Sequence, residues 1–208
     1  MRFGPFSPRG ASPSPASPSC GRAPLADVFA YAGAGGVKLR FDGTEVQVRR
    51  PKAGRPGRRA FVSGKKKQNT KKTTVISDDR GRLLWTGAIR PGRTHDVTAV
   101  RTEGIEDLLL QHHKVRAEVD SGYQGLARDF PDQITAPPKK PGTDARPDEV
   151  AEWEQTRKAQ SSRRIRVEHA IAEPRQWRPL QRYIGRREDF DETMLAIAGL
   201  VSDRCAVR

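Results

Sequence analysis

The chain has 208 residues, enough for one domain with a buried core. Only 35% of the residues are hydrophobic, so we expect part of the length to lie outside the fold. No apolar run approaches the roughly 18 residues that span a bilayer, and the start lacks the apolar centre of a signal peptide. We therefore expect a cytoplasmic protein. Cys20 and Cys205 lie far apart without a Cys or His cluster, which argues against a zinc site or a disulfide framework.

The formal charge of +14 is concentrated in one segment. Residues 49–72 contain eleven Lys or Arg and no acidic residue, and the rest of the chain carries a net charge of only +3. Such a block suits DNA or RNA, because each cation that neutralises a phosphate releases condensed counterions. A solvated arm and an anionic membrane surface are the alternatives, although no amphipathic helix accompanies the block. The candidate phosphate-binding residues are Arg49, Arg50, Lys52, Arg55, Arg58, Arg59, Lys65, Lys66, Lys67, Lys71 and Lys72.

The first third of the chain predicts a tail, a short helix and a strand. Residues 1–23 mix Pro, Ser and Gly without a hydrophobic period, and we expect them to be disordered. A helix of one or two turns is expected over 25–31, ended by the glycines that follow. Residues 37–48 alternate as a strand does, with Asp42 on the polar face and Gly43 next to it. Because an Asp beside a Gly is commonly a turn residue, Asp42 alone is a weak catalytic signal.

The next segments predict an antiparallel meander and a helix. The basic segment is expected to be a loop with a short strand near 59–63. Two strands follow at 72–77 and 83–89, joined by a hairpin turn. A single helix is expected from Asp96 to about residue 112, with Asp96 as its N-cap.

A second candidate acid ends the strand expected at 114–120. Asp120 precedes a turn that contains glycine, at the position where α/β sheets place their sites, although turn chemistry alone would also favour an Asp there. A short strand is expected near 130–136. After it come a loop and an exposed helical insertion over 139–160.

The last long helix is expected over 161–182, and it carries a third acid, Glu168. Local chemistry favours an ion pair between Arg164 and Glu168, four residues apart, which is worth only a few tenths of a kcal/mol. Residues 194–201 are apolar enough for a closing helix that packs on the sheet.

Several segments occur together in an order that is typical of one family. These are FDGTEV, the basic linker, the hairpin, RPGRTHD, EVDSGYQG, RRIRVEHAIAE and RPLQRY. The three acids are separated by 78 and then 48 residues. From about residue 25 to residue 204, the chain resembles the catalytic domain of DDE transposases from bacterial insertion sequences, in particular those related to insertion sequence 5.

The resemblance implies an α/β, ribonuclease H-like fold. This fold is a mixed sheet whose first three strands are antiparallel, with flanking helices and a late helix that carries the third acid. The implied organisation is a disordered tail over 1–23 and a catalytic domain over 24–208, with the basic loop 49–72 and the insertion 139–160. The family's acidic triad corresponds to Asp42, Asp120 and Glu168. The resemblance gives Asp96 an auxiliary or capping role, and Arg164 would hold a DNA phosphate or orient Glu168.

Three carboxylates suit two Mg²⁺ or Mn²⁺ ions about 4 Å apart, which promote in-line displacement at phosphorus. The implied activity is cleavage and transfer of DNA strands. Its partners would be double-stranded DNA, both the element's terminal repeats and the target, and further copies of the chain assembled on that DNA. In the cell, the protein would be associated with the nucleoid.

Two departures from the family keep other readings open. Pro174 predicts a kink or break of the helix near residues 170–173, because proline removes a backbone hydrogen bond. A Pro/Ser-rich segment also stands where family members carry an N-terminal DNA-binding domain. The alternatives are an inactive, truncated transposase remnant that only binds DNA, and an unrelated basic nucleic-acid-binding protein.

Overall fold

The structure is a computed structural model, and it describes residues 23–50 and 57–206. The side chains of residues 160–171 and 205–206 are not part of this description. The disorder expected for the tail falls on residues outside it, so that expectation stays a prediction. So does the domain boundary at residue 24.

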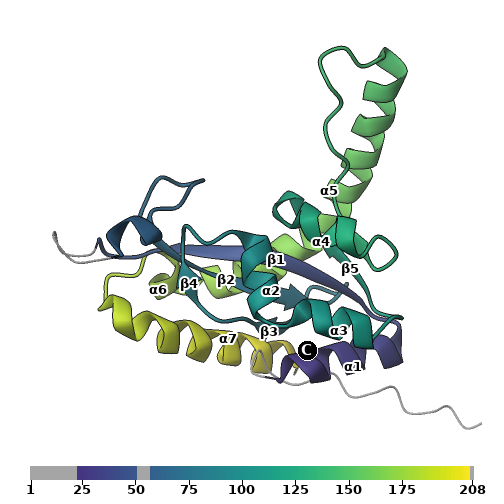
Figure 1. Ribbon diagram of the computed structural model, residues 1–208. Helices are drawn as coiled ribbons and strands as arrows, with labels where there is room; N and C mark the ends of the chain where they lie inside the picture. Colours follow the sequence, from purple (N-terminus) through teal and green to yellow (C-terminus); the bar gives the residue numbers. More distant parts are fainter. Residues whose placement is uncertain (1–22, 51–56, 207–208) are drawn as a thin grey trace, which may run out of the picture.

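A six-stranded mixed sheet forms the centre of the molecule, with the order β3-β2-β1-β5-β6 and with β4 paired to β2 (Figure 1). The strands are β1 (Lys38–Gln47), β2 (Thr70–Ser77), β3 (Leu83–Thr86), β4 (Arg90–Pro91), β5 (Arg116–Val119) and β6 (Ile134–Thr135). The first three strands are antiparallel, whereas β5 is parallel to β1 and β6 is parallel to β5. The expected ribonuclease H-like fold is confirmed by this order and these directions.

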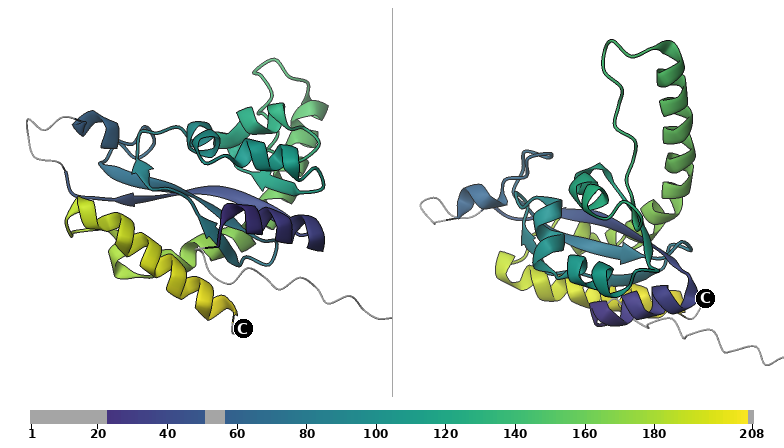
Figure 2. Two further views of the ribbon diagram at one scale, coloured as in Figure 1. Left: turned by 60° about the horizontal axis from the view of Figure 1, so that its bottom comes forward. Right: turned by 45° about the vertical axis from the view of Figure 1, so that its right-hand side comes forward.

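Helices cover both faces of the sheet. They are α1 (Leu25–Gly35), η1 (Arg58–Phe61), α2 (Asp96–Thr102), α3 (Ile105–Gln111), η2 (Ser121–Tyr123), α4 (Gln124–Asp129), α5 (Pro147–Arg175), α6 (Arg178–Gln181), η3 (Arg187–Asp189) and α7 (Phe190–Ala206). Figure 2 shows α2, α3 and α4 on one side of the sheet and α7 on the other. The first part of α5 projects from the body, together with the loop before it.

Alternation along β1 divides the core between these two faces. Phe41 packs with Phe29 of α1 and with the buried residues of α2, α3 and α4. Val46, on the opposite face, packs with Met194 and Ile197 of α7. The closing helix expected over 194–201 is therefore confirmed, and it extends further in both directions. Asp42 lies at an even-numbered position, so it shares the face on which Val46 packs.

Three local expectations are wrong, each for a local reason. The first helix has eleven residues and not one or two turns, because it continues through its glycines until Gly36 ends it in a left-handed conformation at φ 61°. The helix expected from residue 96 to 112 is two helices, separated by Gly104 at φ 74°. The strand expected near 59–63 is the 3-10 helix η1, after which only Val62 bridges to Asn69.

The late helix also differs from its expected bounds. The insertion and the helix that carries residue 168 form one continuous α5 of 29 residues, while α6 is separate. The predicted break near 170–173 does not occur. Pro174 lies in the last turn, and α5 ends one residue later, at Arg175. A proline so near the end of a helix interrupts only the last turn of the hydrogen-bond ladder.

Candidate active site

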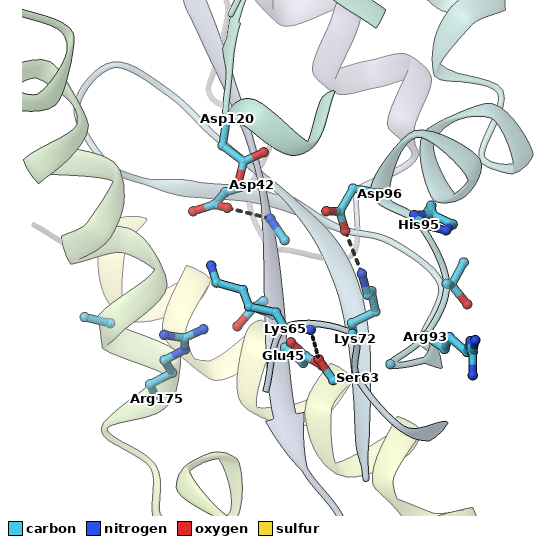
Figure 3. Close-up of a pocket in the computed structure, with 16 residues that line it drawn as sticks. Asp42, Glu45, Ser63, Lys65, Lys72, Arg93, His95, Asp96, Asp120 and Arg175 are labelled. Carbon is cyan, nitrogen blue, oxygen red and sulfur yellow. Dashed lines mark hydrogen bonds and ion pairs between the residues drawn. The ribbon is translucent and has the colours of Figure 1, made fainter. Parts of the chain in front are cut away.

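The register of two parallel strands brings Asp42 and Asp120 together. Phe41 of β1 is paired with Val119 of β5, so the next residue of each strand is an aspartate. Figure 3 shows the two side chains next to each other at this edge. Both residues are partly exposed, and both line the same cleft. The sheet therefore gathers two of the three predicted acids, although 78 residues separate them in the chain.

Backbone amides hold each aspartate in place. The Gly43 amide donates a hydrogen bond of 2.7 Å to Oδ1 of Asp42, and the Gly122 amide donates one of 2.7 Å to Oδ1 of Asp120. Asp120 thereby caps η2. The turn role considered for Asp120 is therefore real, and it fixes the carboxylate at the edge of the cleft.

Asp96 is a third carboxylate at this site. Its Oδ2 lies 2.6 Å from where a Cβ on Gly122 would stand, and Oδ1 of Asp120 lies 3.0 Å from the same point, so a larger residue there would displace these carboxylates. The expected capping role of Asp96 is wrong, because His95 occupies the N-cap of α2 and no side chain makes the capping bond. Asp96 instead accepts a hydrogen bond of 2.8 Å from Nζ of Lys72 (Figure 3).

Tyr123 lies beneath these acids, and sequence reasoning did not single it out. Its side chain is fully buried, and its hydroxyl makes no hydrogen bond of normal geometry within the described residues. Burial raises the pKa of Tyr123 far above its ordinary value, and the negative charges of Asp96, Asp120 and Asp42 raise it further. The phenol therefore stays neutral and adds no charge to the acidic cluster. The only sequence signal for this residue is the GY step within EVDSGYQG.

An open cleft of about 660 Å³ contains the three aspartates. Cationic side chains line it as well, namely Lys65 from the basic segment, Arg93 from the loop before α2, and Arg175 from the end of α5. All three of these residues are exposed, and Figure 3 shows Lys65 and Arg175 on the side of Asp42 and Arg93 on the side of His95. Arg93 and Arg175 were missed in the sequence, because their neighbours there are unremarkable and only the fold brings them to the acids.

Helix α5, which carries the third predicted acid, Glu168, forms one wall of the cleft. Ala172 and Arg175 line the cleft from this helix. Position 168 precedes them by about one turn and two turns, so it belongs to the same face of the helix. The side chains of Glu168 and Arg164 lie outside the described residues, and their roles stay predictions.

The predicted DNA-binding cations lie in two different settings. Arg49, Arg50, Arg59, Lys65, Lys66 and Lys67 are exposed and Arg58 is half-buried, whereas Lys52 and Arg55 lie outside the described residues. Lys71 and Lys72 point inward, with side-chain exposures of 11% and 15%, and pair with Asp191 and Asp96. These two lysines hold the fold and the cleft together, so little of either ammonium is exposed to a phosphate.

The donor set of the cleft is chemically suited to a divalent metal. Carboxylate oxygens are the ligands that Mg²⁺ and Mn²⁺ prefer. No group of three His, Cys, Asp or Glu side chains among the described residues is arranged for a metal ion, and Asp96 is tied to Lys72. Asp42 and Asp120 therefore provide two carboxylates, and a complete set requires a further ligand from a neighbouring element.

The sheet is ribonuclease H-like, and two aspartates from neighbouring parallel strands lie together in its cleft. The family model of the DDE superfamily endonucleases matches residues 41–202, and the chain belongs to this family. No curated protein and no solved structure matches the chain. Across the part of the chain that the structure describes, no helix is long and apolar enough to cross a membrane.

Proposed function

We propose that the chain is the catalytic domain of an insertion-sequence transposase, running from residue 24 to residue 208, which cleaves DNA strands and joins them to target DNA. The observation that carries the proposal is the pair Asp42, within β1, and Asp120, at the end of the parallel neighbour β5, which lie together in an open, cation-lined cleft. The match to the DDE endonucleases supports DNA as the substrate. The relation to insertion sequence 5 rests on the resemblance of the segments alone.

The cleft suits Mg²⁺ or Mn²⁺, which Asp42 and Asp120 would hold together with Glu168 from α5. When bound, two such ions supply Lewis-acid stabilisation for both oxygens of an in-line displacement at phosphorus. Asp96 is auxiliary in this proposal. Its ion pair with Lys72 holds α2 against β2, beside the other two acids.

The remaining side chains bind and orient the DNA. Lys65, Arg93 and Arg175 line the same cleft as the acids and would hold the phosphates on either side of the bond that is cut. Arg164, one turn before Glu168 on α5, would bind the same strand or orient that glutamate. The cleft is open to solvent, so a water molecule or a DNA 3′-hydroxyl can reach the phosphorus.

The direct test is strand cleavage by the purified chain with Mg²⁺ or Mn²⁺, on DNA that carries the element's terminal repeats. We expect Asp42→Asn, Asp120→Asn and Glu168→Gln each to reduce nicking and strand transfer by at least about 100-fold, because each variant removes a charged metal ligand. Asp132→Asn is the matched control, since Asp132 is exposed and lies outside the cleft.

Two results would contradict the proposal. Cleavage that survives Asp120→Asn would show that Asp120 is not a catalytic acid, which contradicts the proposed site. Salt-sensitive binding by a wild-type chain that cleaves nothing would identify a DNA-binding remnant. Native mass spectrometry of the chain bound to paired terminal repeats measures the number of chains in each complex and so tests the expected multimer.

A further inference from the structure

A second basic segment lies far from the first in the sequence. Residues 175–187 contain five arginines and no acidic residue. They fall between α5 and α7 and include the short helix α6. The arginines are Arg175, Arg178, Arg182, Arg186 and Arg187. By its charge, this segment is as suited to a polyanion as residues 49–72 are.

The fold places the two basic segments side by side. The Tyr183 amide donates a hydrogen bond of 2.9 Å to the carbonyl of Gln47, and Arg182 forms a parallel bridge with Gln47. At the neighbouring end of the sheet, the guanidinium of Arg187 stacks 4.4 Å from the ring centre of Phe61. Figure 1 shows α6, η1 and the start of α7 together at this end.

A groove of about 700 Å³ lies between the two segments. Its charged lining is entirely cationic, with Arg49, Arg50 and Lys67 from the first segment and Arg182 from the second. Among the described residues, none of these four forms an ion pair. Four unneutralised cations in one concave surface favour an anionic ligand with repeated charges.

One tight turn separates this groove from the catalytic cleft. Oγ of Ser63 accepts hydrogen bonds from the amides of Lys65 and Lys66, at 3.2 and 3.0 Å, and the Ser63 carbonyl accepts one of 3.0 Å from the Lys67 amide. Lys65 lines the cleft, whereas Lys67 lines the groove. The turn therefore serves as a common wall with a cation on each side.

We infer that the groove formed by Arg49, Arg50, Lys67 and Arg182 binds the sugar–phosphate backbone of the DNA substrate beyond the phosphate that is cut. A duplex whose backbone passes over the turn at 63–69 contacts Lys65 in the cleft and Lys67 in the groove. The identification of the ligand as DNA rests on the proposed function. The groove thus fixes the position of the duplex, while the cleft performs the chemistry.

The test is the salt dependence of duplex binding by the full chain, measured by fluorescence anisotropy in EDTA so that no cleavage occurs. Each cation that contacts a phosphate contributes about 0.9 to the slope of log affinity against log salt. We expect Arg49→Gln/Arg182→Gln to reduce this slope by about 2 and to weaken binding to all sequences similarly. Arg80→Gln/Arg128→Gln removes the same charge from exposed positions outside the groove, and its slope should equal that of the wild type.

The outcomes separate this inference from the proposed function. Equal slopes for the groove double variant and the control double variant would overturn the groove, even if the wild type cleaves DNA. A reduced slope for the groove variant alone supports the groove, even if no cleavage is found. Circular dichroism of both double variants at the assay temperature confirms that the compared chains are folded.

Discussion

At the scale of single residues, Lys67 has an unusual backbone. Among the residues that the structure describes, it is the one residue other than glycine with a positive φ, at 55°. A left-handed backbone is unfavourable for most L-residues and least so for Gly and Asn. The turn that holds it is closed by Ser63 on one side and by the Val62–Asn69 bridge on the other. A strained conformation that the surrounding structure holds in place is often associated with function, and here it places a cation at the groove.

Replacement of this residue should separate stability from DNA binding. We expect Lys67→Asn to raise the free energy of unfolding by up to about 1 kcal/mol, because Asn adopts the left-handed conformation more readily. The same change should reduce the salt slope of duplex binding by about 1. Thermal unfolding and anisotropy titrations measure the two effects.

Lys66→Asn is the control for this substitution. Lys66 is the preceding exposed lysine, it does not line the groove, and it lacks a positive φ. Its replacement should give no gain in stability. A Lys67→Asn chain that unfolds more easily than the wild type would show that the left-handed backbone is not a source of strain.

At the scale of secondary-structure elements, Glu103 joins the end of α2 to β4. Its side chain is 5% exposed and accepts a hydrogen bond of 2.7 Å from Arg90. Burial raises the pKa of Glu103, and the attraction of Arg90 only partly opposes this effect. The folded state therefore binds the Glu103 proton more tightly than the unfolded state does.

The sign of the resulting pH dependence follows from linkage. Stability from this group is complete below the pKa of Glu103 in the unfolded chain, and it is lost as the pH rises through the higher pKa of the folded state. We expect Glu103→Gln to lack this loss. Urea unfolding midpoints from about pH 4 to about pH 8 should therefore fall less with pH in the variant than in the wild type.

Asp107→Asn provides the matched control, since Asp107 is an exposed acid on the neighbouring helix α3. Its pH profile should parallel that of the wild type. If the unfolding midpoints of Glu103→Gln also change with pH as those of the wild type do, the pKa of Glu103 does not differ between the folded and unfolded chains.

At the scale of the whole molecule, the proposed metal ligands come from three elements that only the complete fold brings together. Asp42 belongs to β1, Asp120 follows β5, and position 168 lies on α5. A ligand that binds only the folded state stabilises it, by about 2.7 kcal/mol when its concentration is 100 times its dissociation constant.

We therefore expect Mn²⁺ to raise the thermal unfolding midpoint of the wild-type chain. The double variant Asp42→Asn/Asp120→Asn should show no such rise, because both described carboxylate ligands are lost. Glu168→Gln should reduce the rise if α5 contributes a ligand. Differential scanning fluorimetry over a series of Mn²⁺ concentrations measures the unfolding midpoints of the wild type and both variants. An equal rise in all three chains would show that the metal binds elsewhere.

The sequence by itself determined the features that depend on neighbouring residues. Alternation predicted β1, β2, β3 and β5 to within a few residues, except for the end of β3, because burial of one face imposes a period of two. The turn after Asp120 was predicted from Gly122, a local signal, whereas β1 continues straight through Gly43 after Asp42. The order of these strands, together with the family resemblance, was sufficient to predict the ribonuclease H-like sheet.

Only the tertiary structure decided which distant residues meet. The β1–β5 register aligned Asp42 with Asp120, and the ion pairs Lys71–Asp191 and Lys72–Asp96 hold two of the predicted DNA-binding lysines within the fold. The bridge between Gln47 and Arg182 brings Arg182 into the groove that Arg49 lines, and no local pattern in the sequence indicates this. Such contacts depend on strand register and on helix packing between residues that are 24 to 135 positions apart, whereas sequence patterns report only what lies within a few positions.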